Sequence, residues 1–381
     1  MFLHDITATV SHEQGYKYIN ENRIQLHNSM EDVSWNGSST NGSQIYILAD
    51  GHGGAGAAEY FVRVLSEAVL ELIESKTFDL ALEKDRTELL LDLTNIFIQA
   101  DNDYTLLKYD QFIEWSPEDT TLKKPDDDGC TLVLNIIMNG HLINANIGDS
   151  RTILMVQEGE ESRIVFSSVD HNTTNPTKIV EIVQNGGNFV SQRGQILTVS
   201  QNDLNQDLSQ LIHARIYRSP SLLSVNIGLS HRRTLNLTGS LGDIHFKLDP
   251  PVLSSVPDVS IMELDSNLEY ILIAATDGVW DHLRSAPNLQ RQNDTVKDLV
   301  SSALKGHYDD IITDKMTLPT PETSIDSCEK FDNTLILERL KYAANSLVKR
   351  ENDDQTLDLF YDCLTRYDDA TAQIIYMGPC Q

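Results

Sequence analysis

The sequence has no run of about eighteen apolar residues, the length that a membrane-spanning helix needs. It also lacks the basic start and apolar stretch of a signal peptide, since it opens Met1-Phe-Leu-His-Asp-Ile. Its four cysteines are scattered, without a CxxC pair or the spacing of a disulfide framework. These absences predict an intracellular protein, cytoplasmic or nuclear, that is not embedded in a membrane.

Positive charge is scarce as well. Lysine and arginine number 29 against 57 acidic residues, which gives a formal net charge of −28. Such a surface repels nucleic-acid phosphates and anionic lipid, so neither is an expected partner. No heptad pattern suggests association with another copy, and we expect a monomer. The eleven histidines include no HExxH motif, so zinc chemistry has little support.

Apolar periodicity predicts strands separated by blocks of helix. Strands are expected at residues 43–49, 131–138, 141–147, 259–264, 269–275 and 372–376. Helices are expected at about 55–75, 85–107, 176–185, 295–305 and 333–349. Asn139-Gly140 is a favoured hairpin turn between two of the strands. Hairpin-linked strands with helices in separate blocks favour an α+β fold over a parallel sheet.

Two polar stretches without a firm period, residues 109–128 and 193–233, are interpreted as insertions in a single domain that spans residues 1–381. The second insertion is unusually basic for this chain. It contains Arg215, Arg218, Arg232 and Arg233. It is either a flap that contacts a bound phosphate group or a disordered polar loop, and the sequence leaves both interpretations open.

Acidic residues recur where the predicted strands begin or end. They are Glu31-Asp32, Asp50, Asp149, Asp277 and Asp368-Asp369. If these strands pack together, the carboxylates meet at one end of the fold, where like charges resist ionising together. Divalent cations relieve that repulsion, and ligands that are all oxygen favour Mg²⁺ or Mn²⁺.

A competing motif is Gly51-His52-Gly53-Gly54-Ala55-Gly56, which satisfies the GxGxxG pattern of dinucleotide-binding loops. Two features oppose that interpretation. Asp50 would face the pyrophosphate at short range, and the region about twenty residues on is still helical instead of being a second strand that ends in an acid.

In this order, the segments resemble the metal-dependent protein phosphatases of type 2C, over about residues 15–377. The matching segments are Met30-Glu31-Asp32, Asp50-Gly51-His52-Gly53-Gly54, Gly129-Cys130-Thr131, Asn146-Ile147-Gly148-Asp149-Ser150-Arg151, Asp170-His171, Glu181 to Gly187, Ser240-Leu241-Gly242-Asp243, Thr276-Asp277-Gly278-Val279-Trp280-Asp281 and Asp368-Asp369-Ala370-Thr371. The resemblance implies a single phosphatase-like catalytic domain in which two packed antiparallel sheets are flanked by helices, a four-layer αββα sandwich.

The resemblance also implies a centre with two or three Mg²⁺ or Mn²⁺ ions. Asp50 would bridge two ions, and Glu31 with the Gly51 carbonyl would complete one site, assisted by Asp32 through water. Asp277 and Asp368 would complete the other site, and Asp149 with Asp277 would hold a third ion. A metal-activated water would then attack the phosphorus of a phosphoserine or phosphothreonine in a phosphoprotein.

The resemblance gives His52 the role of protonating the departing alkoxide, and the alternative is that it only orients a neighbouring acid. With Asp50 and Asp149 it makes up the expected catalytic set. The remaining motif residues are expected to be structural. They are Arg151, Asp170, Asp243 and the core residue Trp280, together with Cys130 as a small buried side chain.

The chain departs from the family pattern where substrate phosphate is gripped. The family usually has an arginine four residues before the Glu-Asp pair, and here that position is His27, with Arg23 the nearest arginine. Imidazole cannot copy the two-pronged contact of guanidinium with phosphate. Gly239 also replaces the arginine of a Ser-Arg-x-x-Gly-Asp element. These changes leave open an alternative, a weak or inactive phosphatase-like protein that acts as a binding or regulatory module.

Overall fold

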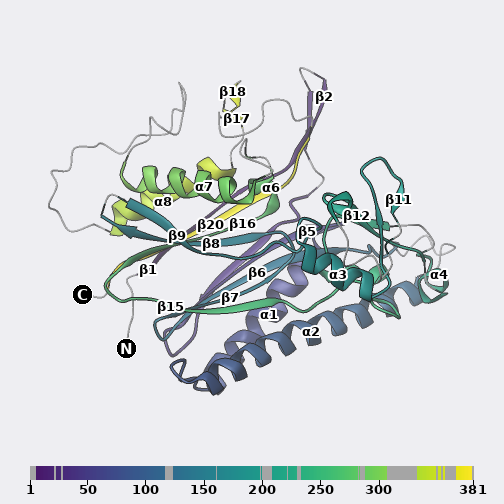
Figure 1. The fold of residues 1–381 in the computed structure, drawn as a ribbon, viewed down its shortest axis with the longest axis horizontal. Coiled ribbons are helices and arrows are strands. Elements are labelled where there is room, and N and C mark those ends of the chain that lie inside the picture. Colours follow the sequence, from purple (N-terminus) through teal and green to yellow (C-terminus); the bar gives the residue numbers. More distant parts are fainter. Residues whose placement is uncertain are drawn as a thin grey trace.

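The computed structural model describes most of the chain. The described residues are 6–20, 23–26, 29–115, 123–159, 161–197, 199, 208–220, 222–229, 233–281, 283, 288–306, 333–348, 351–352, 355–356 and 366–379. Two antiparallel sheets lie face to face, with a pair of helices on the outer side of each (Figure 1). The predicted αββα sandwich is therefore confirmed.

Five strands form the first sheet and six the second. The first has the order β1 (Ile6–Glu13), β20 (Ala370–Met377), β16 (Glu269–Ala275), β8 (Arg151–Glu158) and β9 (Glu161–Ser167). The second has the order β15 (Asp258–Glu263), β7 (His141–Ile147), β6 (Gly129–Met138), β5 (Gln44–His52) and β4 (Val33–Ser38), and β14 (Leu241–Gly242) pairs with β6 as its sixth strand.

Each sheet packs against its own pair of helices. Helices α7 (Leu289–Leu304) and α8 (Asn333–Val348) share an apolar core with the first sheet. Helices α1 (Gly56–Ser75) and α2 (Glu83–Glu114) share one with the second sheet. Helix α7 begins six residues before the predicted position, at an Asn288 side chain that accepts a hydrogen bond from the Arg291 N–H.

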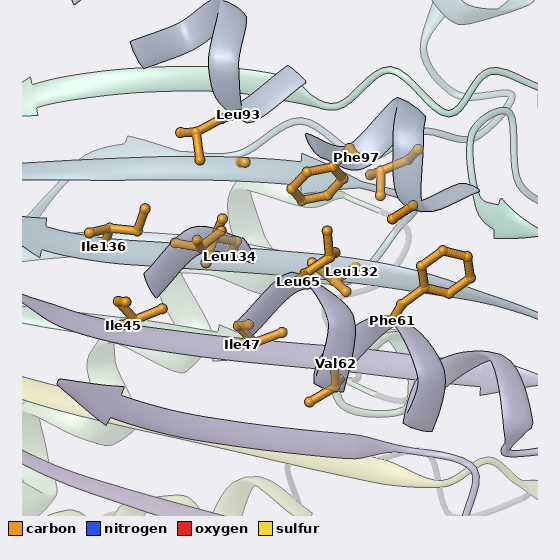
Figure 2. Packing of buried hydrophobic residues seen from close by; sticks show 14 of the residues in the cluster. Ile45, Ile47, Phe61, Val62, Leu65, Leu93, Phe97, Leu132, Leu134 and Ile136 are labelled. Atoms are coloured by element: carbon orange, nitrogen blue, oxygen red, sulfur yellow. The ribbon is translucent and has the colours of Figure 1, made fainter. Parts of the chain in front are cut away.

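Strand β5 shows how one apolar run serves two interfaces. Ile45 and Ile47 face the helices α1 and α2, while Tyr46 and Leu48 face the other sheet. Because successive strand residues point to opposite faces, a strand buried on both sides must be apolar throughout. Figure 2 shows Ile47 beside Leu65 of α1, with Leu93 and Phe97 of α2 on the same side of the sheet.

Helix α1 has the two faces that its sequence predicts. Its apolar residues Phe61, Leu65, Val69 and Leu72 are buried. Its charged residues Glu59, Arg63, Glu67 and Glu71 are exposed. The spacing of three to four residues therefore decides which side of the helix meets the sheet.

Helix α2 is longer than predicted and extends into the stretch interpreted as an insertion. It ends at Glu114 instead of Leu107. The added turns bury Phe112 against Ile227, Leu229 and other apolar side chains that come from a distant part of the chain. Local periodicity could not show this contact, so the predicted helix end at Leu107 is wrong.

The hairpin between β6 and β7 is confirmed. Asn139 and Gly140 have φ angles of 51° and 72°. Two successive positive φ angles are what a two-residue turn of type I′ requires, and asparagine and glycine adopt them at the lowest cost.

The second predicted insertion contains ordered secondary structure. It contributes strands to a sheet with the order β11 (Ile196–Leu197), β10 (Asn188–Val190), β12 (Arg215–Arg218) and β13 (Arg233–Leu235). With α3 (Pro176–Gln184) these strands enclose a separate apolar cluster that includes Phe189 and Ile216. The polar-loop interpretation is therefore wrong for the described part of this stretch.

Short elements complete the described chain. They are β2 (Tyr16–Asn20), β3 (Arg23–Leu26) and β19 (Arg366–Tyr367) in a three-stranded sheet, the pair β17 (Glu351–Asn352) and β18 (Gln355–Thr356), a 3₁₀ turn (Ser209–Leu211), α4 (Leu222–Asn226), α5 (Ile244–Lys247) and α6 (Asp277–Trp280). Within the described ranges, no helix is both long and apolar enough to cross a bilayer.

Candidate active site

Strand register brings the acidic strand ends to one end of the sandwich. In the second sheet Val33 lies opposite Ala49, which places Asp32, just before β4, next to Asp50 on β5. In the first sheet the end of β16 lies between the start of β8 and the start of β20. The carboxylates of Asp149, Asp277 and Asp368 therefore lie near Asp50 and act on it electrostatically.

The gathered carboxylates oppose one another's ionisation. Enclosure by protein, followed by the charges of Asp277 and Asp32, raises the pKa of Asp50 well above its usual range. Burial and the charge of Asp277 do the same to the pKa of Asp149. Burial, partly offset by hydrogen bonds, raises the pKa of Asp32 to about 7. A cluster of this kind is stable as anions only when cations lie among them.

Two carboxylate oxygens at this end are buried without a hydrogen-bond partner among the described residues. They are Oδ1 of Asp32 and Oδ1 of Asp149. The second oxygen of Asp32 accepts a hydrogen bond from Thr276 Oγ1 at 3.0 Å, which fixes the orientation of that carboxylate. A buried acceptor without a partner costs free energy, and a divalent cation is a partner that would satisfy it.

The backbone around Glu31 is held by Asp369. Its carboxylate accepts hydrogen bonds from the N–H groups of Glu31 and Gly15, each at 2.6 Å. Gly51 approaches the same segment so closely that a Cβ there would lie 2.5 Å from the Glu31 carbonyl oxygen. Only glycine allows this approach, and it brings the backbone of residue 51 beside Glu31.

The donor set fits Mg²⁺ or Mn²⁺ in its chemistry. All the candidate ligands are oxygen atoms, and two of them are the buried, unpartnered atoms described above. In the part of the chain that the structure describes, no three histidine, cysteine or carboxylate side chains form by themselves a group that could hold a metal ion. Mg²⁺ is usually bound through one or two carboxylates and keeps several waters, so water would complete each site.

His52 lies beside this cluster and is paired with Asp243. Its Nε2–H donates to both carboxylate oxygens of Asp243, each at 2.9 Å. The His52 side chain is 28% exposed and that of Asp243 is 1% exposed. Burial alone would lower the pKa of His52, but the charge of Asp243 and the hydrogen bond to it outweigh that effect and raise the pKa. The pair therefore favours the imidazolium form, which can donate a proton.

Asp243 and Asp281 at this site were given no functional role from the sequence. Asp243 was interpreted as structural, yet its carboxylate bonds directly to His52. Asp281 lies beside Asp277 and helps to raise the pKa of that residue, after burial. Asp281 could have been recognised from its spacing of four residues from Asp277, which is one helical turn. Asp243 gave no local signal, because it is 191 residues from His52.

The structural interpretation of Arg151 and Asp170 is confirmed. Arg151 donates from Nε and Nη2 to the two oxygens of Asp170, at 2.9 and 2.6 Å. Its Nη1 donates to Gln292 and Asn293 of α7, and its guanidinium stacks 4.6 Å from the centre of the Trp280 ring. Because every donor group is used inside the protein, Arg151 joins β8 to α7 beneath the acidic cluster.

The structure describes only some of the residues expected to contact a substrate phosphate. His27 lies outside the described residues, and Arg23 is described only as part of strand β3. Arg232 also lies outside them. Arg215 bonds to Thr234 and Arg218 bonds to two backbone carbonyls, so both guanidinium groups are tied to neighbouring protein groups.

Arg233 connects the small sheet to the loop before β6. Its guanidinium contacts the Asp127 carboxylate at 3.0 Å and also donates to the Asp127 carbonyl oxygen. The phosphate contact suggested for Arg233 is therefore not supported, since Asp127 holds this side chain. The contact instead ties the small sheet to the segment that precedes Gly129.

The chain is similar in sequence to members of one known family. The model of the protein phosphatase 2C family matches residues 10–316, so Asp368 lies beyond the matched segment. "Probable protein phosphatase 2C 2" of Paramecium tetraurelia is 26% identical over 263 residues, 66% of this chain and 68% of that protein. "Protein phosphatase 2C 1" of the same organism is 26% identical over 293 residues, 74% of this chain and 77% of that protein.

A solved structure is similar over nearly the whole chain. It is the serine-threonine phosphatase 2C from Toxoplasma gondii, with a TM-score of 0.60 and 16% sequence identity. The match covers 98% of this chain and 95% of that one. At this level of identity the similarity shows a shared fold.

Proposed function

Because this chain belongs to the protein phosphatase 2C family, we propose that it is a metal-dependent phosphatase that hydrolyses phosphoserine and phosphothreonine in proteins. Curated relatives are named protein phosphatases, so by family the protein is a phosphoric monoester hydrolase. The observation that carries the proposal is the cluster of strand-end carboxylates, with two unpartnered oxygens, beside a histidine that favours its protonated form.

We assign the metal-binding roles to the residues of that cluster. Glu31, the Gly51 carbonyl and Asp50 would hold one Mg²⁺ or Mn²⁺, with Asp32 acting through water. Asp50, Asp277 and Asp368 would hold a second ion, and Asp149 with Asp277 a third. When bound, the ions supply an activated water and neutralise charge on the phosphoryl oxygens.

His52 is assigned the proton that the leaving group needs. As the bond between phosphorus and the serine or threonine oxygen breaks, that oxygen takes a proton from the imidazolium, which becomes neutral imidazole. The water oxygen forms the new bond to phosphorus. The acidic residues next to His52, Glu31 and Asp243, support the charged form of the ring before transfer.

Hydrolysis of a phosphothreonine peptide in the presence of Mn²⁺ or Mg²⁺ tests the proposal. We expect turnover that EDTA abolishes and that Asp277→Ala lowers by at least ~100-fold, because the cluster loses a carboxylate that two of the assigned sites share. Calorimetry would report whether Mn²⁺ binds. Binding without turnover in the wild-type protein would reject catalysis and favour a phosphatase-like binding module.

Replacing His27 by arginine tests the departure from the family pattern. If weak phosphate contact limits the enzyme, His27→Arg should lower KM by ~10-fold, because charged hydrogen bonds from guanidinium are stronger than one from imidazole. Steady-state kinetics with the same peptide measures it, and Arg23→Ala is the companion variant. An unchanged KM in His27→Arg would show that another group binds the phosphate.

A further inference from the structure

The contact between His52 and Asp243 uses one particular nitrogen of the imidazole. Nε2 is engaged by both oxygens of the carboxylate, so Nδ1 is the nitrogen that remains for a substrate. A carboxylate on Nε2 keeps a proton there and fixes the plane of the ring, because the hydrogen bond at one nitrogen sets the state of the other. The arrangement therefore determines both where His52 points and which nitrogen gives up its proton.

Asp243 is itself held rigidly in place. Ser240 Oγ donates to its Oδ2 at 2.6 Å, and its backbone N–H donates to the Asp128 carbonyl at 2.9 Å. The preceding N–H, that of Gly242, donates to Asp101 Oδ1 at 2.7 Å. Asp243 also has a φ of 55°, a conformation that a non-glycine residue adopts only when its surroundings impose it.

Strand β6, at Gly129, leaves only enough space for the contact between His52 and Asp243. A Cβ on Gly129 would lie 2.3 Å from Asp243 Oδ2 and 2.6 Å from His52 Nε2. Glycine at the start of β6 is thus required by the pair itself. The backbone conformation of Asp243, its hydrogen bonds and the absence of a side chain at Gly129 all favour the contact between His52 and Asp243, which are far apart in sequence.

We propose that Asp243 is a positioning residue that holds His52 with Nδ1 directed at the leaving oxygen. The inference rests on the proposed function, since it assigns a role within the same reaction. In the step, the bond from phosphorus to the serine or threonine oxygen breaks and that oxygen takes the Nδ1 proton. Nε2–H stays on the ring, still bonded to Asp243, so the imidazole that results is neutral and correctly placed for the next cycle.

Two substrates with different leaving groups distinguish a loss of His52 positioning from a general loss of protein stability. An alkoxide must be protonated as it leaves, whereas the nitrophenolate of p-nitrophenyl phosphate departs as a stable anion. We expect Asp243→Asn to lower kcat for a phosphothreonine peptide by ~100-fold, the size of a general-acid contribution. The loss with p-nitrophenyl phosphate should be at least ~10-fold smaller, because general-acid help matters less there.

The matched control is Asp101→Asn. Asp101 supports the same segment, through Gly242 and a buried ion pair with Lys247 at 3.0 Å, but does not contact His52. The Asp101→Asn variant should therefore lower kcat for the phosphothreonine peptide and for p-nitrophenyl phosphate by the same factor. Gly129→Ala, which changes neither partner but fills the space between them, should reproduce the selective loss of Asp243→Asn.

A double-mutant cycle keeps the inference testable if a variant is unstable. In a His52→Ala background, Asp243→Asn should change the ratio of the two kcat values by less than ~2-fold, because the group that it positions is gone. Equal losses on both substrates in Asp243→Asn, or a selective loss that persists without His52, would overturn the inference. A wild-type protein without metal-dependent turnover on either substrate would instead reject the proposed function.

Discussion

Replacing Arg151 by alanine is expected to lower the free energy of unfolding by about 3–5 kcal/mol, the range seen when one partner of a buried ion pair is removed. The side chains of Arg151 and Asp170 are 3% and 6% exposed, so the remaining carboxylate would stay buried without its cation. The substitution also removes two hydrogen bonds to α7 and the stacking on Trp280. Urea denaturation followed by circular dichroism measures the change.

Arg163→Ala is the matched control for Arg151→Ala. Arg163 lies on β9, the strand next to β8, and its pair with Glu158 is 61% and 48% exposed. An exposed pair contributes at most about 1 kcal/mol because water and salt screen it. Similar losses in the two variants would show that burial of the Arg151 pair does not decide its effect.

Replacing Gly278 by alanine is expected to disable the site without removing any carboxylate. A Cβ at this position would lie 1.8 Å from the Asp369 carbonyl oxygen, so the start of α6 and the start of β20 must move apart. Asp277 and Asp368 stand on the two sides of that contact. We expect turnover to fall by at least ~100-fold, since a shift of about 1 Å in a catalytic group can cost that much.

Calorimetric titration with Mn²⁺, together with turnover, measures the effect of Gly278→Ala. The control is Gly37→Ala, because a Cβ there would lie 2.4 Å from the Trp35 ring and would disturb a strand end remote from the cluster. The control should change thermal stability but leave Mn²⁺ affinity intact. If Gly278→Ala binds Mn²⁺ and turns over as the wild type does, the spacing of the two strand ends does not matter to the site.

The sandwich and its acidic end were predictable because their signals are local. A short apolar run such as Ile45 to Ala49, followed by Asp50-Gly51, indicates a buried strand, and an acid that follows such a run lies near the end of its strand. Several runs with the same ending therefore predict a common cluster even when the pairing of strands is unknown. Helix α1 could be predicted equally well, because the period of about 3.6 residues in its apolar positions defines both its buried and its exposed face.

Contacts between distant segments were not predictable in the same way. Helix α2 continues past Leu107 because Phe112 packs against Ile227, and the sequence around residue 112 gives no sign of that distant contact. The role of Asp243 depends on a histidine 191 residues away and on the space that Gly129 leaves. A glycine-aspartate pair read alone is a turn, so its function appears only when the fold brings its partner to it.

The position of β20 has a consequence for how the protein is made. This strand lies between β1 and β16, and among the described strands β1 pairs with β20 alone. A ribosome would release β1 more than 350 residues before the strand that it must pair with. The backbone N–H of Glu31 would likewise lack its acceptor until Asp369, whose carboxylate accepts its hydrogen bond, has been synthesised. Synthesis therefore leaves the first sheet divided until its final strand is available, and the growing chain has no complete acidic cluster with which to act on a substrate.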